Sequence, residues 1–208
     1  EAGQTLPIEQ TEAWDRFDLA QEGRQPWGRL VYRDADGRDR ALISLTRTQV
    51  RGFPYLWARH APVWLGAAPT AAEEADLRAR LVEHIHHADP TAVFVRLHAR
   101  VAGEDCHELL QTMTYDRTVV LDLDHPSDEG LLASFKPRGR RDVRKALRNE
   151  SMRFDDETPR AQEVFAELYA VLLETGDRDG FRPATEQTYR TMLAALGPEH
   201  ARLYVGRD

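Results

Sequence analysis

The densest group of side chains able to bind an anion lies between Phe135 and Arg153. This segment carries eight basic residues against two acidic ones, a net charge of +6 in a chain whose net charge is −7. At about 100° per residue in a helix, five of the cations fall within an arc of roughly 140°. Val143, Ala146 and Leu147 take the opposite side, where they are expected to pack. Pro137 suits the first turn of this helix.

Like charges on one helix face repel each other unless something anionic neutralises them. The segment is therefore predicted to bind a partner that carries phosphate groups, although a solvated helix face is the ordinary alternative for a run of charges. Six of its residues are the predicted phosphate ligands: Lys136, Arg138, Arg140, Arg141, Arg144 and Lys145.

A second set of candidate anion ligands surrounds the segment 176–183, GDRDGFRP, which is expected to link two helices. Arg178 and Arg182 lie within it, and Tyr189 follows in the next predicted helix. Guanidinium groups bind phosphate and carboxylate through paired hydrogen bonds, so these residues are predicted to bind substrate. Arg16, on the opening helix, is a candidate of the same kind. The alternative is a helix-connecting turn with its phenylalanine in the core and its arginines in solvent.

Residues that could hold a metal or act as a nucleophile form no complete set in this sequence. The histidines 84, 86 and 87 end a predicted helix, but no carboxylate or cysteine at ligand spacing completes a metal site. Cys106, the one cysteine, is expected to be buried and structural. No Ser-His-Asp, P-loop or dinucleotide-binding signature is present, so the catalytic residues stay unknown and no metal is predicted.

The composition is that of a soluble globular protein with one large or two small domains. Of its 208 residues 41% are hydrophobic and 30% are charged. No stretch approaches the ~20 apolar residues of a membrane-spanning helix, and the amino-terminal residues lack the pattern of a signal peptide. A single cysteine makes the cytoplasm the expected location. Because the sequence begins with Glu1 and ends in a strand-like run, we expect a piece of a longer protein.

The elements that would position these residues follow from periodicity and capping signals. Before the basic segment we expect a helix after Thr11, strands over 27–33, 39–50 and 53–65, a helix from Thr70 to Ala88, a fully buried strand over 91–99, a short helix over 104–113 and a strand over 117–124. A hairpin turn over 34–37 is expected to join the first two strands. Thr70 and Glu73 form a predicted capping box, and Leu77, Leu81 and Ile85 are the predicted buried stripe of that helix. After the basic segment we expect a strand over 151–156, helices over 159–176 and 183–196, and a strand over 201–206. This α+β order, with a mixed sheet, resembles GCN5-related acetyltransferase-like (GNAT-like) domains.

Three stretches resemble the Fem family of tRNA-dependent aminoacyltransferases, which build the peptide bridges of peptidoglycan. They are RTVVLDLDHPSDEGLLASFKPRGRRDVRKALRN, GFPYLWARHAPVWL, and FAELYAVLLETGDRDGF with the later TYRTM. The first resembles the family's strand, short helix and basic linker helix. The second resembles its strand leading to a Gly/Ala-Pro-Val motif, and the third its Arg-x-Gly-Phe turn between helices. The similarity runs from about Ile8 to the end.

The resemblance implies tandem GNAT-like domains, the second truncated in this chain: a first domain over 1–125, basic linker helices over 126–150, and half of a second domain over 151–208. It implies transfer of an amino acid from aminoacyl-tRNA to a UDP-linked or lipid-linked muramyl-pentapeptide, with transient contact with a membrane surface for the lipid-linked form. No cofactor is needed. Residues that assist transfer in the family would lie beyond Asp208.

In the family, basic residues on the first helix and after the Arg-x-Gly-Phe turn grip the diphosphate of the precursor. Arg16 matches the first position. Ala184 and Thr188 align with the second and cannot bind a diphosphate, which leaves Arg182 and Tyr189 as the nearest substitutes.

Two other functions remain open on the sequence. An acyl-CoA-dependent N-acyltransferase would need a glycine-rich turn before a helix, and WLGAAPTAAEEA fits that requirement poorly. A non-catalytic module could bind RNA or anionic lipid through the basic helix. Against RNA binding, the sequence predicts no sheet face of stacking aromatics.

Overall fold

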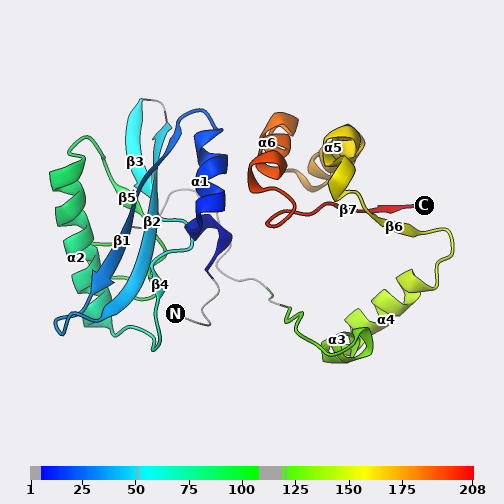
Figure 1. Ribbon diagram of the computed structural model, residues 1–208, viewed down its shortest axis with the longest axis horizontal. Helices are drawn as coiled ribbons and strands as arrows, with labels where there is room; N and C mark the ends of the chain where they lie inside the picture. The colour runs from blue at the N-terminus through cyan, green and yellow to red at the C-terminus, as the bar shows by residue number, and fades with distance from the viewer. Residues whose placement is uncertain (1–5, 51, 108–118, 120) are drawn as a thin grey trace. The chain divides into compact units, whose positions relative to one another are not determined.

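In the computed structural model, which describes residues 6–50, 52–107, 119 and 121–208, the chain divides into two units. The first unit comprises Glu1–Cys106 and Thr158–Arg202, and the second comprises His107–Glu157 and Leu203–Asp208. Both contain helices and strands (Figure 1), so the predicted α+β class with a mixed sheet is confirmed. Among the described residues, every helix is too short or too polar to cross a bilayer.

A long hairpin is the base of the five-stranded sheet in the first unit. Its strands β1 (Arg24–Arg33) and β2 (Asp39–Val50) are joined by the predicted turn. Asp34 accepts hydrogen bonds from the backbone amides of Asp36 and Arg38, and Gly37 adopts the left-handed φ of +79° that this turn requires. Strands β3 (Phe53–Trp57) and β4 (Val63–Trp64) pair antiparallel with β2, and β5 (Val95–Arg96) pairs parallel with β3.

Helix α2 (Ala71–Ala88) covers one face of this sheet. The Thr70 hydroxyl accepts a hydrogen bond from the Glu73 amide, as the predicted N-cap requires. The Glu73 carboxylate does not return to the cap, because the Arg40 guanidinium takes it at 2.6 Å. The predicted apolar stripe of α2, Leu77, Leu81 and Ile85, is buried against strand residues of the hairpin and β3.

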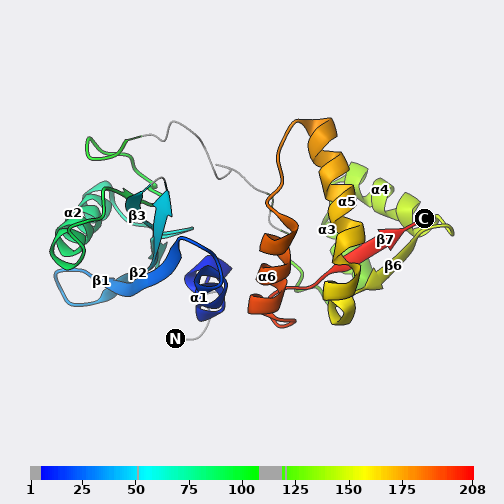
Figure 2. The ribbon, with the colours of Figure 1, turned by 90° about the horizontal axis from the view of Figure 1, so that it is seen from above.

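The opposite face receives the amino-terminal segment. It consists of the short 3-10 helix η1 (Ile8–Gln10) and helix α1 (Glu12–Leu19), which Figures 1 and 2 show across the sheet from α2. Helix α1 also packs against α6 (Glu186–Leu196) through Ala13, Phe17 and Leu196. Helix α6 follows η2 (Thr158–Arg160) and α5 (Ala161–Asp179). The first unit therefore combines segments that are far apart in the sequence.

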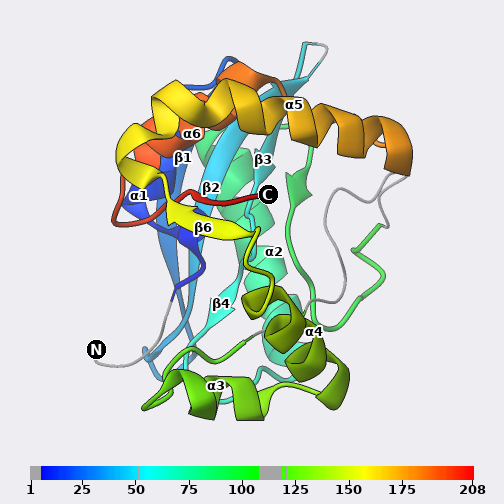
Figure 3. The same cartoon turned by 90° about the vertical axis from the view of Figure 1, so that its right-hand side faces the viewer.

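The second unit contains the predicted basic helix as α4 (Pro137–Leu147), preceded by α3 (Asp128–Ser134). Strand β6 (Arg153–Asp156) follows and pairs antiparallel with β7 (Tyr204–Arg207), as Figure 3 lets the reader trace. Pro137 occupies the first helical position, as predicted. The prediction that one side of the helix packs is wrong: within the described residues α4 has no buried side chain, and Leu147 is 72% exposed.

Three further predictions need correction. The fully buried strand over 91–99 is reduced to β5, and Val93 and Phe94 before it are exposed. The predicted strand 117–124 is absent from residues 119 and 121–124, where Leu121 and Leu123 are exposed. Of the predicted helix 104–113, residues 104–107 are not helical and the rest lie outside the described residues. In the run 91–99, Val95 and Leu97 pack against the core under α2, whereas alternate residues such as Phe94 point to the other face of the sheet, which α2 does not cover.

Candidate functional site

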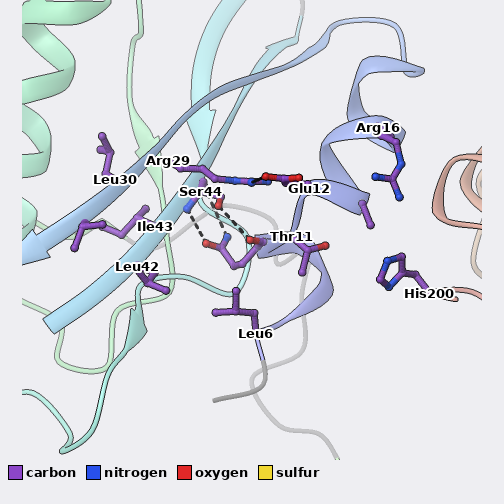
Figure 4. A pocket seen from close by; sticks show the side chains of 13 residues that line it. Leu6, Thr11, Glu12, Arg16, Arg29, Leu30, Leu42, Ile43, Ser44 and His200 are labelled. Atoms are coloured by element: carbon purple, nitrogen blue, oxygen red, sulfur yellow. Dashed lines mark hydrogen bonds and ion pairs between the residues drawn. The ribbon is translucent and has the colours of Figure 1, made fainter. Parts of the chain in front are cut away.

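A cavity of about 480 Å³ lies between the amino-terminal segment and the β1–β2 hairpin, within the first unit (Figure 4). Its walls combine apolar side chains of the strands, such as Val31 and Leu42, with polar groups of α1. Arg16 and His200 lie on the same side of this cavity. Alternation along the strands places Val31 and Leu42 on the face opposite α2, which is why the hairpin can line it.

The charged residues around this cavity differ in whether a residue of opposite charge already contacts them. The Arg29 guanidinium is held by the carboxylates of Glu12, at 3.2 Å, and Asp15. Burial raises the pKa of Asp15 above its ordinary value, and Arg29 opposes that effect. Arg16 uses only its Nε, which donates to the carbonyl of Ala195 at 3.2 Å. Its two terminal nitrogens form no ion pair with any residue that the structure describes, so Arg16 is the cation here that is able to bind an added anion.

The sequence analysis missed a buried polar network behind this cavity. Asp18, with no exposed surface, accepts hydrogen bonds from the Thr46 hydroxyl at 2.6 Å and from Arg59 at 3.2 Å. Burial lowers the pKa of Arg59, and Asp18 opposes that effect. Gln10 donates to the Arg59 carbonyl and accepts from the Ser44 amide, at 2.6 and 2.7 Å. This network fixes η1 and α1 on the sheet and so fixes the wall that carries Arg16.

The other predicted substrate ligands are distributed along α5 and α6. The Arg178 guanidinium forms paired hydrogen bonds with its neighbour Asp179, at 2.9 and 3.1 Å, which lower the pKa of that carboxyl. Arg182 is exposed and has no ion pair among the described residues. Tyr189 lies within a cluster of rings, 6.0 Å from Phe165 and 6.3 Å from Tyr169.

Helix α6 separates the two arginines that the resemblance pairs on one diphosphate. Arg16 contacts Ala195 near its carboxyl end, whereas Arg182 precedes its amino end. The 11 residues of α6 span roughly 16 Å. A shared role in holding one diphosphate therefore stays a prediction that requires both side chains to extend along the helix. The alternative interpretation of the turn is wrong in one point, since Phe181 is 48% exposed rather than packed in the core.

The predicted phosphate ligands of α4 differ in their surroundings. Arg140 donates to the carbonyls of Ala133 and Phe135, at 2.9 and 2.6 Å, and so caps the end of α3. Arg138 and Arg141 share the carboxylate of Asp142, at 3.7 and 3.3 Å. In the part of the chain that the structure describes, the remaining predicted ligands have no ion pair: Lys136, Arg144 and Lys145. Of these three available cations, Arg144 and Lys145 lie beyond the first turn of α4, and Lys136 precedes the helix.

Aromatic rings gather on one face of β3, where Trp57 is buried as core packing predicts. Phe53, Tyr55 and Trp57 alternate along β3 on the face opposite α2, and Phe94 stacks on Tyr55 with ring centroids 4.7 Å apart. Period-two alternation in FPYLW was the available signal. Pro54 and Pro62 obscured it, because proline in a run argues against a strand interior.

The chain has a mixed α+β fold, and a cavity with Arg16 at its edge lies in the first unit. No protein-family model and no curated protein matches the sequence. Among solved structures, the fold is similar to that described as the crystal structure of FemX, with a TM-score of 0.63 and 19% identity. The similarity covers 96% of this chain and 52% of the FemX chain, so the chain spans about half the length of its match. The predicted resemblance to the Fem family is therefore confirmed at the level of the fold.

Proposed function

We propose that this chain is part of a Fem-like aminoacyltransferase, which moves an amino acid from aminoacyl-tRNA to the stem-peptide amine of a peptidoglycan precursor. The observation that carries the proposal is the similarity to FemX over 96% of the chain. Tandem GNAT-like domains over 1–125 and 151–208, joined by linker helices over 126–150, belong to the same proposal, as does a cytoplasmic location.

Arg16 supports the acceptor half of the proposal. A muramyl-pentapeptide, whether linked to UDP or to a lipid, carries a diphosphate that needs a cation with free donors. Arg16 offers two uncommitted terminal nitrogens at a cavity of about 480 Å³. Arg29 is a weaker candidate because two carboxylates already neutralise it.

Helix α4 supports the donor half. Arg144 and Lys145 lack carboxylate partners among the described residues, and RNA binding draws most of its affinity from such cations at phosphates. Arg140 contributes less in this proposal, because its guanidinium already donates to carbonyls at the end of α3.

The transfer reaction requires few catalytic groups from the protein. The amine nitrogen attacks the ester carbonyl, the bond between that carbon and the ribose oxygen breaks, and the amine proton passes to a base while the ribose oxygen gains a proton. A base and an oxyanion donor are required. We assign neither to a residue of this chain and propose that a substrate phosphate takes the proton.

The amino end of α2 is poorly suited to bind the pyrophosphate of an acyl-CoA, which argues against the acyl-CoA alternative. Pyrophosphate would need free amides and a favourable potential at that helix end. Thr70 already accepts from the Glu73 amide, and Glu73 and Glu74 place two acidic residues in the first turn. The Thr70 hydroxyl therefore already occupies an amide that a pyrophosphate would need.

Calorimetric titration of the chain with UDP-muramyl-pentapeptide, with UDP and with acetyl-CoA tests the acceptor half. We expect the unmodified chain to bind the pentapeptide and Arg16→Gln to bind it with about tenfold lower affinity, because a charge-assisted contact contributes roughly 1.5 kcal/mol. Arg38→Gln, an exposed arginine of the β1–β2 turn, is the matched control. Binding of acetyl-CoA alone would replace the proposal with the acyl-CoA enzyme.

Binding of tRNA as a function of salt tests the donor half. Replacing both Arg144 and Lys145 by Gln should weaken binding and lower the salt slope by about one to two phosphate contacts. The same double change at Arg33 and Arg38, both exposed on the hairpin, should leave the slope as it was. An unchanged salt slope in the α4 variant would mean that this helix does not bind tRNA.

A further inference from the structure

An aromatic and cationic surface lies on the sheet, on the side opposite α2, and we call it the aromatic face. It is defined by Phe53, Tyr55, Trp57, Phe94 and Arg96. The first three alternate along β3, and register places Arg96 beside Trp57. Tyr55 and Phe94 stack with an interplanar angle of 13°, and the Arg96 guanidinium carbon is 4.3 Å from the centroid of the Trp57 ring. Rings and a guanidinium therefore share one surface.

The outer members of the aromatic face are open to solvent. Phe53 is 65% exposed and Phe94 is 47% exposed, whereas Tyr55 and Trp57 lie buried between their neighbours. Arg96 contacts a ring rather than a carboxylate and has no ion pair with any residue that the structure describes. Exposed rings can stack with a flat ligand, and a guanidinium that has no carboxylate partner in the described chain can bind an anionic group of the same ligand.

Three buried polar atoms along this side of the sheet lack a hydrogen-bond partner among the described residues. They are the Thr48 hydroxyl, the Trp57 indole nitrogen and one terminal nitrogen of Arg59. Thr48 is the register partner of Tyr55, and the Arg59 guanidinium carbon lies 4.1 Å from the Trp57 ring centroid. An unpaired buried polar group costs about 1–3 kcal/mol. The indole and the guanidinium can only donate, and all three atoms lie beneath the surface, so they describe the interior under the aromatic face and not contacts with a bound ligand.

Two histidines lie next to the aromatic face. His98 follows Arg96 on the same side by alternation, and its ring is 5.1 Å from that of His60. The Glu9 carboxylate accepts from His60 at 3.0 Å and is thereby engaged. A peptide would need carboxylates to match this surface, whereas a polynucleotide brings both flat bases and phosphates.

We propose that the aromatic face binds single-stranded RNA, with bases stacked on Phe53 and Phe94 and a phosphate at Arg96. Sequence-tolerant single-strand sites combine these two components: rings spaced along a strand and cations that follow the backbone. The proposal stands apart from aminoacyl transfer, since the face could bind such a strand whether or not the protein transfers an amino acid.

Fluorescence anisotropy of a labelled oligoadenylate of about eight nucleotides tests the proposal at several salt concentrations, because one single-strand-binding fold covers about this length. Phe94→Ala should weaken binding about tenfold. Arg96→Gln should lower the salt slope by about 0.7, the value for one phosphate of a single strand. Phe53→Ala, at a still more exposed position, gives a second reading that does not depend on the fold tolerating the change at Phe94.

Two controls separate this site from other positive surfaces. Phe154→Ala removes an exposed ring from β6, 59% exposed, and should leave the affinity within about twofold. Replacing Arg144 and Lys145 on α4 by Gln should weaken the oligoadenylate less than Phe94→Ala does. Absence of binding by the unmodified chain, or binding that only the α4 variant reduces, would overturn the proposal. Either result would leave the proposed transfer reaction untouched, because that is measured with the pentapeptide and intact tRNA.

Discussion

Helix α2 of the first unit and helix α4 of the second unit are both amphipathic, yet they use their apolar sides differently. In α2 the stripe of Leu77, Leu81 and Ile85 is 1–4% exposed under the sheet. In α4 Leu147 is 72% exposed, and no described side chain of the helix is buried. The comparison teaches that periodicity predicts a helix and its apolar side, whereas burial also requires a second surface of matching width.

The two regions also treat charge differently. Around α1 and β2 the buried charges Asp18 and Arg59 contact each other, and Thr46 completes their hydrogen bonds. On α4 the one carboxylate, Asp142, lies between Arg138 and Arg141, both mostly exposed. Buried charges must be paired to be tolerated, while exposed cations can wait for an anionic partner. The first arrangement favours stability and the second favours binding.

Asp18→Asn should have the largest effect and tests the charge half of this comparison. The amide can still accept from Thr46, but Arg59 loses its buried counter-ion, so we expect the free energy of unfolding to fall by about 4 kcal/mol. Asp142→Asn on α4 is the matched control and should change stability by less than about 1 kcal/mol. Urea denaturation followed by tryptophan fluorescence measures the first unit, since all four tryptophans lie in Glu1–Cys106, and far-UV circular dichroism is followed as well because Asp142 lies in the second unit. Equal effects of the two changes would contradict the distinction.

Leu81→Ala and Leu147→Ala test the packing half. Truncation of a leucine that is 4% exposed should lower the free energy of unfolding by about 3 kcal/mol through lost burial and a cavity. The same truncation at Leu147 should cost less than about 0.5 kcal/mol. Far-UV circular dichroism is needed here besides fluorescence, because α4 lies outside the unit that holds the tryptophans. A large loss at Leu147 would mean that a surface covers α4 in solution.

Local signals in the sequence were sufficient for the elements that local chemistry decides. The Asp34–Gly37 turn, the Thr70 cap and Pro137 at the first position of α4 each act within a few residues, and each is where the sequence placed it. The strand predicted over 91–99 failed because its length depends on how much of β3 remains to pair with it. In the described chain, regular register between β5 and β3 is limited to Leu56↔Val95 and Trp57↔Arg96, although single backbone hydrogen bonds such as that from Val93 to Pro54 continue beyond it.

The candidate site was predictable only in part, because its contacts join residues far apart in the chain. Arg16 was singled out on the sequence, but nothing there indicated that it reaches Ala195, 179 residues away. Asp18 and Arg59 are 41 residues apart, and neither carries a local signature. Arg178 was predicted as a ligand from its charge, whereas the structure shows that its guanidinium already donates to the carboxylate of Asp179. The type of a side chain predicts which ligands it is able to bind. The fold decides whether another residue of the protein already contacts that side chain.

The smallest expected effect concerns His98, which tests whether the edge next to the aromatic face tolerates a further charge. Burial lowers the pKa of His98 below its usual value near 6.5, and the neighbouring His60 and Arg96 lower it further while Glu9 opposes them. A histidine whose folded-state pKa is depressed favours folding in its neutral form. That contribution is complete above about pH 6.5 and is lost as the pH falls from there through the folded-state pKa.

We therefore expect the unfolding midpoint in urea to fall between pH 7.5 and 5.5 by less in His98→Asn than in the unmodified chain. His87→Asn, exposed at the end of α2, is the control and should keep the full pH dependence. If His98→Asn keeps it as well, the pH dependence arises elsewhere and the positive charge at this edge is already accommodated by the fold.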